Sequence, residues 1–188
     1  MGRGALGSGL IVLDRDGVIN RESKAFVKSA SEWIPLPGSL DAITDLSRAG
    51  YTLAVASNQS GLGRGLFDRR ALKAMHAKLR RELGRRGGRI DRIVVCPHLP
   101  EDGCDCRKPR PGLLLRLARH YDTSLSGVPF VGDSLRDLET ALAAGARPVL
   151  VRTGNGRETE ESLPRALRGI DVHDDLAAFA EATLGRAS

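Results

Sequence analysis

Short apolar runs alternate with amphipathic segments along most of the chain. Five predominantly apolar runs have the length and composition of buried strands in a parallel sheet. They cover residues 10–13, 52–56, 90–96, 129–132 and 148–152. Four intervening segments and one closing segment carry apolar residues at helical spacing or helix-capping signals, and they cover residues 38–49, 68–83, 111–118, 134–144 and 174–184. The alternation predicts a doubly wound α/β fold with a parallel sheet of order 5-4-1-2-3 and right-handed crossovers.

The chain length and its connections predict one domain. A chain of 188 residues can bury one sizeable core, so we expect a single domain over residues 1–188. Three connections are long, and each follows a predicted strand, where such folds carry their chemistry. They cover residues 17–37, 57–67 and 97–110.

Two aspartates follow the first predicted strand directly. The apolar run 10–13 leads into Asp14, and Asp16 comes two residues later. Side chains alternate along a strand, so both carboxylates would point the same way if the strand continued. Two such carboxylates repel each other, which a bound cation or a shared reaction would explain. A plain strand-end turn is the alternative.

Three further polar motifs follow other predicted strands. The segment 57–65 contains hydroxyls and glycines that could cradle an anion, or it is a flexible surface loop. Asp133 follows the fourth strand, which the predicted order places beside the first, so its carboxylate would join Asp14 in a site suited to Mg²⁺. Alternatively, Asp133 caps the next helix. Lys108 could balance this acidic site and bind phosphate, or lie in an exposed basic turn.

All three cysteines lie within eleven residues and share this segment with a histidine. Three thiols and one imidazole at this spacing match a closed tetrahedral Zn²⁺ site, and an odd number of cysteines argues against a disulfide framework. The predicted ligands are Cys96, His98, Cys104 and Cys106. Because no position is left for water, we expect a structural ion that rigidifies the loop 96–106 and orients Arg107 and Lys108.

The amino-acid composition limits where we expect the protein to be located and what we expect it to bind. The chain is 41% hydrophobic and 28% charged, with a net charge of +6. Eleven basic residues against three acidic ones lie between 64 and 92, which indicates a nucleic-acid surface or a solvated helix face. An aromatic content of 4% favours the helix face. No apolar run could span a bilayer, and residues 1–8 lack the features of a signal peptide, so we expect a cytoplasmic protein.

These motifs, in this order, resemble the haloacid dehalogenase (HAD) superfamily of phosphotransferases over residues 10–152. The matching positions are Asp14 with Asp16, Ser57, Lys108, and Asp133 with Asp137. The resemblance implies a Rossmann-like three-layer sandwich. Neither residues 17–37 nor 57–67 could form a large cap domain.

The resemblance also implies roles for the matched residues. Asp14 would be the nucleophile that forms an aspartyl phosphate, and Asp16 the general acid and base, with a pKa raised by its neighbours. Catalytic Mg²⁺ would be held by Asp14, Asp133 and the backbone carbonyl of Asp16. Ser57 and Lys108 would hold the transferring phosphoryl oxygens.

The zinc loop narrows the resemblance to the heptose bisphosphate phosphatases of this superfamily. It implies removal of the C7 phosphate of D-glycero-D-manno-heptose 1,7-bisphosphate, a step toward nucleotide-activated heptose and lipopolysaccharide core, by a monomer without a nucleic-acid or membrane partner. The implied substrate-binding residues are Glu22, Ser23, Asn58, Gln59, Ser60, Arg64 and Arg107, with the two arginines for the distal phosphate.

Three alternatives remain open. Histidinol-phosphate phosphatases have a similar zinc loop, and a nucleic-acid 3′-phosphatase would use the same motifs and explain the basic stretch. A zinc-binding interaction module without activity would explain the cysteines, but it leaves Asp14, Asp16, Lys108 and Asp133 without a role.

Overall fold

The structure is a computed structural model that describes residues 9–185. The expectation that residues 1–8 contain no signal peptide concerns a segment outside the described residues. Among the described helices, none is long and apolar enough to cross a membrane.

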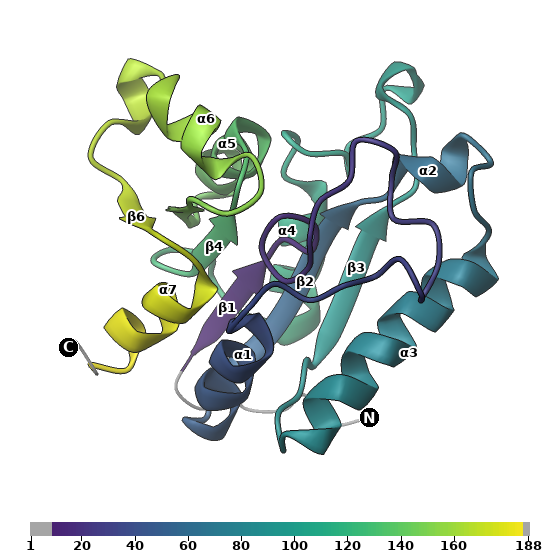
Figure 1. Cartoon of the computed structure of the whole chain (residues 1–188). Coiled ribbons are helices and arrows are strands. Elements are labelled where there is room, and N and C mark those ends of the chain that lie inside the picture. Colours follow the sequence, from purple (N-terminus) through teal and green to yellow (C-terminus); the bar gives the residue numbers. More distant parts are fainter. Residues whose placement is uncertain (1–8, 186–188) are drawn as a thin grey trace.

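Six parallel strands form one sheet in the order β3-β2-β1-β4-β5-β6 (Figure 1). The strands are β1 (Leu10–Leu13), β2 (Thr52–Asn58), β3 (Arg92–Cys96), β4 (Pro129–Gly132), β5 (Arg147–Val151) and β6 (Asp171–His173). The first five have the predicted order, but the prediction of five strands is wrong at one edge. There β6 pairs with β5, and its three residues are too few for a periodic signal.

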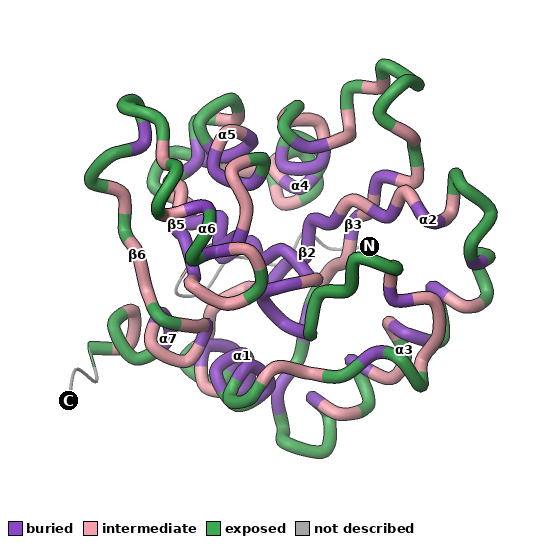
Figure 2. Tube along the Cα trace, turned by 45° about the horizontal axis from the view of Figure 1, so that its top comes forward, coloured by how far each residue is buried: buried purple, intermediate pink, exposed green. Residues whose placement is uncertain are grey.

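Helices cover both faces of the sheet, which gives the expected three layers (Figures 1 and 2). One face carries α1 (Ser39–Arg48), α3 (Arg69–Arg85) and α7 (Leu176–Thr183), and the other carries α4 (Gly112–Tyr121) and α5 (Leu135–Ala144). Two short helices that the sequence did not predict lie in loops: α2 (Ser60–Gly63) and α6 (Gly156–Glu161). Two single turns of 3₁₀ helix cover Pro100–Asp102 and Arg165–Leu167.

The central strand β1 is apolar throughout because both its faces are buried. Ile11 and Leu13 pack into the core under α1 and α3, whereas Leu10 and Val12 pack into the core under α4. All four residues are at most 4% exposed. Burying each such side chain is worth about 1.5–3 kcal/mol, so the sheet is a rigid support for the residues that follow it.

Strand pairing brings the ends of β1 and β4 together. Leu13 is the register partner of Val131, and the backbone N–H of Asp14 donates to the Val131 carbonyl at 2.8 Å. Asp14 and Asp133 therefore leave adjacent strands at the same edge of the sheet, as the predicted strand order requires.

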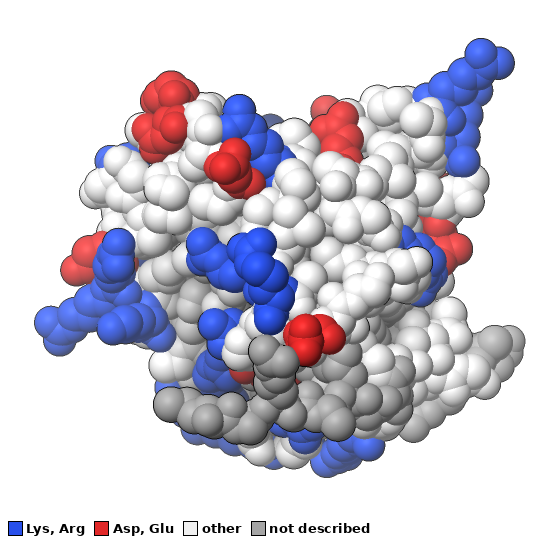
Figure 3. Space-filling view, turned by 180° about the vertical axis from the view of Figure 1, so that it is seen from behind, with Lys and Arg blue, Asp and Glu red and all other residues white. Residues whose placement is uncertain are grey.

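Much of the basic stretch 64–92 is engaged with the protein itself. Lys78 donates to the carbonyls of Ala30 and Trp33, and Arg80 donates to the carbonyl of Ile90. Arg86 pairs with Asp41. These contacts favour the solvated-face interpretation. The opposite face of the molecule, seen from behind, carries lysines and arginines in separate groups with acidic residues among them (Figure 3).

Candidate active site and metal centres

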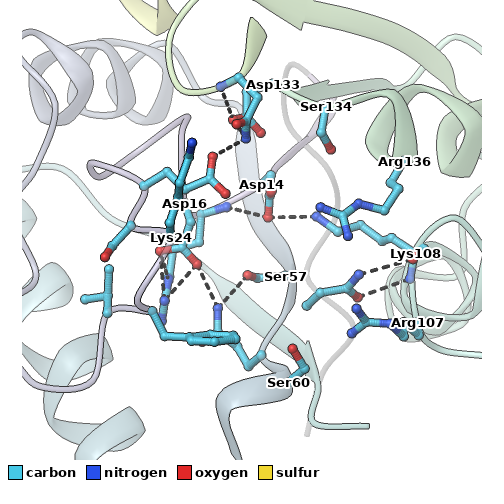
Figure 4. Close-up of a pocket in the computed structure, with 18 of the residues that line it drawn as sticks. Asp14, Asp16, Lys24, Ser57, Ser60, Arg107, Lys108, Asp133, Ser134 and Arg136 are labelled. Atoms are coloured by element: carbon cyan, nitrogen blue, oxygen red, sulfur yellow. Dashed lines mark hydrogen bonds and ion pairs between the residues drawn. The ribbon is translucent and has the colours of Figure 1, made fainter. Parts of the chain in front are cut away.

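A cavity of about 310 Å³ opens at the carboxyl ends of the central strands (Figure 4). Every residue that the sequence assigned to catalysis, Mg²⁺ or substrate lines it: Asp14, Asp16, Glu22, Ser23, Ser57, Asn58, Gln59, Ser60, Arg64, Arg107, Lys108 and Asp133. The fold thus collects side chains from four separate segments into one site.

Lys108 lies at the base of this cavity, between two carboxylates. Its ammonium Nζ is 2.8 Å from Asp14 Oδ1 and 2.6 Å from Asp137 Oδ1, and it donates to the Ala56 carbonyl at 3.2 Å. The lysine is 4% exposed. Burial alone would lower the pKa of Lys108, but the carboxylates of Asp137 and Asp14 raise it above its ordinary value. Lys108 is therefore a fixed positive charge.

Asp137 anchors this lysine from the first turn of α5. Its Oδ2 accepts from the Ser134 hydroxyl at 2.6 Å and from the Ser134 backbone N–H at 3.1 Å, and the side chain is fully buried. A side chain at Gly132 would not fit, because its Cβ would lie 2.2 Å from the Asp137 Cβ. The carboxylate of Asp137 is thus occupied by protein donors.

Asp14 and Asp133 carry unusually high pKa values. Burial raises the pKa of Asp14 to about 7; Lys108 opposes the shift, while Asp137 and Asp16 add to it. Burial, Asp137 and Asp14 raise the pKa of Asp133 to about 8. Oxygens of Asp14, Asp133 and Asp137 lie within 4.8 Å of one another. Both oxygens of Asp137 are engaged, one by Lys108 and the other by Ser134, so Asp14 and Asp133 are left to offer oxygens to a cation, and such donors fit Mg²⁺.

The pKa of Asp16 differs from the value that we expected from the sequence. A raised pKa was predicted, but although burial alone would raise it, Arg15 and the amides of Asn20 and Gln59 lower the pKa of Asp16. Among the groups that lower this pKa, Arg15 acts most strongly: its guanidinium lies 2.8 Å from Asp16 Oδ2 and is itself buried. The prediction is wrong because the chain turns after the strand, at Gly17, and Arg15 folds back onto its neighbour.

The amides after β2 hold other site residues. Gln59 Nε2 donates to Ser57 Oγ and to Asp16 Oδ2, each at 2.9 Å. Asn58 makes two bonds with the backbone of Lys108, through its Nδ2 at 3.2 Å and its Oδ1 at 3.1 Å. Asn58 and Gln59 line the cavity as expected, but their amides are engaged in positioning Lys108, Ser57 and Asp16.

The predicted zinc ligands form a second cluster directly before Lys108. The three thiol sulfurs lie 3.1–3.6 Å apart, and His98 Nδ1 lies 3.2 Å from Cys106 Sγ and 3.6 Å from Cys96 Sγ. A tetrahedral Zn²⁺ site with Zn–S bonds of normal length has ligand–ligand distances of about 3.7 Å. No disulfide joins these cysteines. The donor set and its spacing fit Zn²⁺.

The chain is similar in sequence to known proteins over nearly its full length. A family model described as HAD-hydrolase-like matches residues 105–179. The D-glycero-β-D-manno-heptose-1,7-bisphosphate 7-phosphatase of Bordetella bronchiseptica is 57% identical over 95% of this chain and 99% of its own. The enzyme of that name from Pseudomonas putida is 55% identical over 91% of this chain and 97% of its own.

Two solved structures that resemble this chain are of enzymes with the same activity in their names. The D,D-heptose 1,7-bisphosphate phosphatase of B. bronchiseptica, complexed with magnesium and phosphate, matches with a TM-score of 0.91 at 57% identity, and covers 95% of this chain and 99% of that one. The enzyme from Burkholderia thailandensis matches with a TM-score of 0.73 at 45% identity, over 94% of this chain and 99% of that one. This chain belongs to the heptose bisphosphate phosphatase family of HAD-like hydrolases.

In this member of the family, the outer rim of the cavity comes from the loop after β1. Glu22 and Ser23 are exposed there, and the exposed Arg64 and the half-buried Arg107 line the same cavity. Trp33, fully buried, fixes the loop by donating from Nε1 to Asn20 Oδ1 at 2.9 Å.

Sequence reasoning gave no site role to several residues that line this cavity. They are Arg15, Lys24, Phe26, Val27, Ser134, Arg136 and Asn155. Arg15 lies between Asp14 and Asp16, whereas Lys24, Phe26 and Val27 follow Ser23 in the long connection 17–37. Asn155 lies in the loop after β5, whose only signal was its position behind a predicted strand.

Proposed function

We propose that this protein is a phosphatase that removes the C7 phosphate of D-glycero-β-D-manno-heptose 1,7-bisphosphate. The observation that carries the proposal is the cluster of Asp14, Lys108 and Asp133 in a chain 57% identical to a relative of that name over nearly its whole length. The cavity adjoining the cluster has both a cationic and a polar rim, as a sugar bisphosphate requires.

In the first chemical step, a carboxylate oxygen of Asp14 attacks the phosphorus of the C7 phosphate. The new bond is O–P to Asp14, and the bond that breaks joins phosphorus to the sugar oxygen, which leaves with the electron pair. Asp14, Asp133 and the backbone carbonyl of Asp16 would hold Mg²⁺. This ion supplies charge neutralisation between the carboxylate and the phosphate dianion.

Asp16 gives a proton to the leaving sugar oxygen and then takes one from the water that hydrolyses the aspartyl phosphate. In the free site Arg15 keeps Asp16 ionised. Asp16 therefore takes up its proton when the phosphate enters, because added negative charge raises the pKa of a nearby carboxyl group.

Two cavity residues hold the phosphoryl group during both steps. Lys108, whose charge is fixed by its two carboxylates, balances the charge that develops on the phosphoryl oxygens. The Ser57 hydroxyl, oriented by Gln59, donates a hydrogen bond to one of those oxygens. Neither group needs to move during the reaction.

The rim residues recognise the rest of the substrate. Arg64 and Arg107 bind the phosphate at C1, since guanidinium groups form paired hydrogen bonds with phosphate oxygens. Glu22 and Ser23 contact sugar hydroxyls, and Ser60 lines the same cavity.

A structural Zn²⁺ ion outside the cavity would hold two of the site residues in place. Bound by Cys96, His98, Cys104 and Cys106, it would fix the loop that ends at Arg107 and Lys108. The ion has no open coordination position and therefore no part in the chemistry.

Steady-state phosphate release tests this function. The substrates are the β anomer of the heptose bisphosphate, its α anomer, histidinol phosphate and a 3′-phosphorylated oligonucleotide. We expect the highest kcat/KM for the β anomer, exceeding histidinol phosphate and the oligonucleotide by about 100-fold or more. A higher kcat/KM for either of those two would overturn the proposal.

A further inference from the structure

Asn155 lies between the predicted metal site and the predicted sugar-binding loop. Its side-chain Nδ2 donates to Asp133 Oδ2 at 3.1 Å and also to Glu22 Oε2. Its backbone N–H donates to the same Asp133 oxygen at 2.8 Å. An amide NH₂ group has two hydrogens, so one residue can bridge the two carboxylates. The bonds drawn at Asp133 in Figure 4 lie at this point of the cavity.

The side chain of Asn155 is not used for the role that its position favours. Asn155 is the N-cap residue of α6, and asparagine is among the best N-cap residues because its side chain accepts from a free backbone N–H. Here it makes no such bond. The amide is turned instead toward Asp133 and Glu22, which indicates that the bridge is the preferred use of this side chain.

The surrounding loop is built to hold Asn155 at this place. Thr153 Oγ1 donates to the Gly17 carbonyl at 2.6 Å, and Thr159 Oγ1 donates to the Asp133 carbonyl at 3.0 Å. Gly154 has a φ of +58°, and a Cβ there would lie 2.1 Å from Asp133 Oδ2. Only glycine lets the backbone approach this carboxylate so closely.

The hydrogen bonds from Asn155 give the two carboxylate oxygens of Asp133 different roles. Oδ2 accepts both bonds from Asn155, whereas Oδ1 accepts none among the residues that the structure describes. A ligating carboxylate with one oxygen held by outer donors presents the other to the cation in a fixed direction. Without the amide, the carboxylates of Asp133 and Glu22 would face each other with like charge.

We propose that Asn155 is a positioning residue that orients Asp133 for the cation and ties this carboxylate to the substrate loop at Glu22. Metal binding and sugar binding then share one hydrogen-bonding group. The link to the sugar rests on the proposed function, whereas the effect on the cation does not. Loss of an outer-shell partner of a metal ligand typically weakens metal binding about 10–100-fold.

Isothermal titration calorimetry with Mg²⁺ on the zinc-loaded protein tests the first half of this proposal. We expect Asn155→Ala and Asn155→Ser to weaken the Mg²⁺ Kd about tenfold or more, because neither side chain can bridge the two carboxylates. The matched control is Glu158→Gln, an exposed site in the adjoining helix, which should leave the Kd unchanged. Thermal unfolding of each variant reports whether the fold is retained. An unchanged Mg²⁺ Kd in both Asn155 variants would overturn the proposal.

Kinetics at saturating Mg²⁺ test the link to the substrate loop. We expect Asn155→Ala to raise KM for the heptose bisphosphate about threefold or more while kcat changes less, because Glu22 loses its anchor but the reacting groups stay in place. A weakened Mg²⁺ Kd with unchanged KM would overturn this link. Should the wild-type protein fail to hydrolyse that sugar, the proposed function falls, and the calorimetry still decides the role of Asn155 at the cation.

Discussion

The carboxylate cluster at β1 and β4 and the thiol cluster before Lys108 are two candidate cation sites built in opposite ways. Asp14, Asp133 and Lys108 come from distant parts of the sequence and meet only because the sheet brings two strand ends together. The four predicted zinc ligands lie within eleven residues, from the last residue of β3 into the loop after it, and need little of the fold to meet. The first site depends on the fold, whereas Zn²⁺ bound at the second would stabilise it.

The donors differ as much as the construction does. The carboxylate cluster offers hard oxygens and adjoins an open cavity, so substrate can approach the cation. The thiol cluster offers three sulfurs and one imidazole nitrogen, and four protein ligands leave a tetrahedral ion no open position. We therefore assign the chemistry to the first site and propose loop rigidity as the role of the second, and each variant below should disturb one of these two properties.

Asp14→Asn should have the largest effect on activity. The amide cannot attack phosphorus, so we expect kcat to fall by at least about 10⁴-fold, while the melting temperature stays the same or rises because a buried charge is removed. Phosphate release and thermal unfolding measure the two quantities. Appreciable turnover in this variant would refute the assignment of the nucleophile.

Lys108→Met should have the largest effect on stability. It leaves the carboxylates of Asp14 and Asp137 buried without their cation, which costs about 3–5 kcal/mol in the free energy of unfolding. Urea denaturation in Mg²⁺-free buffer measures this change. The control is Lys73→Met on the exposed face of α3, which should change stability by less than about 0.5 kcal/mol. Equal stabilities of the two variants would contradict the central place of Lys108.

Cys104→Ser should separate the two sites. We expect zinc content to fall below one ion per chain and the melting temperature to drop by about 5–10 °C, while kcat well below that temperature changes little. Metal analysis and thermal unfolding check this, with the exposed Asp105→Asn in the same loop as the control that keeps its zinc. Zinc-free protein of unchanged stability would remove the structural role.

The pH dependence of stability should differ with and without Mg²⁺. The pKa values of Asp14 and Asp133 are raised to about 7 and about 8, whereas in the unfolded chain both groups ionise near their ordinary value of 3.8. Between these pH values the folded state binds more protons than the unfolded chain. The Mg²⁺-free protein should therefore lose stability, by about 6 kcal/mol at most, as pH rises from about 5 to 8. Saturating Mg²⁺ lowers both pKa values and should suppress this loss.

Urea titrations across that pH range measure the effect. Burial of His76 acts in the opposite direction: its pKa is lowered to about 4, so it adds stability as pH rises toward 6.5. His76 contributes equally with and without Mg²⁺, so the difference between the two profiles isolates the carboxylates. Parallel profiles would show that Mg²⁺ does not bind at Asp14 and Asp133.

The difference between the local thiol cluster and the carboxylate cluster, which depends on the fold, also explains which features of the protein were predictable from the sequence. The apolar runs and caps such as Asp68 predict the first five strands and the main helices, because period and capping are local properties. The ligand types and spacing predict the thiol cluster for the same reason. The adjacency of Asp14 and Asp133 needed the strand order, which parallel α/β topology restricts to few choices.

The features that could not be predicted depend on the path that the chain takes after each strand ends. The rule of alternating faces stops where β1 ends, so the return of Arg15 onto Asp16 and the lowered pKa that results had no sequence signal. The bridge made by Asn155 spans 133 positions to Glu22, and β6 is too short to carry a period.

The central claim is that the Asp14 site removes one particular phosphate of a heptose bisphosphate. Phosphorus NMR of D-glycero-β-D-manno-heptose 1,7-bisphosphate during turnover with Mg²⁺ tests it most directly, because the two phosphates give separate signals. We expect the C7 signal to be replaced by that of inorganic phosphate while the C1 signal persists. Loss of the C1 phosphate first, or no change in either signal, would contradict it.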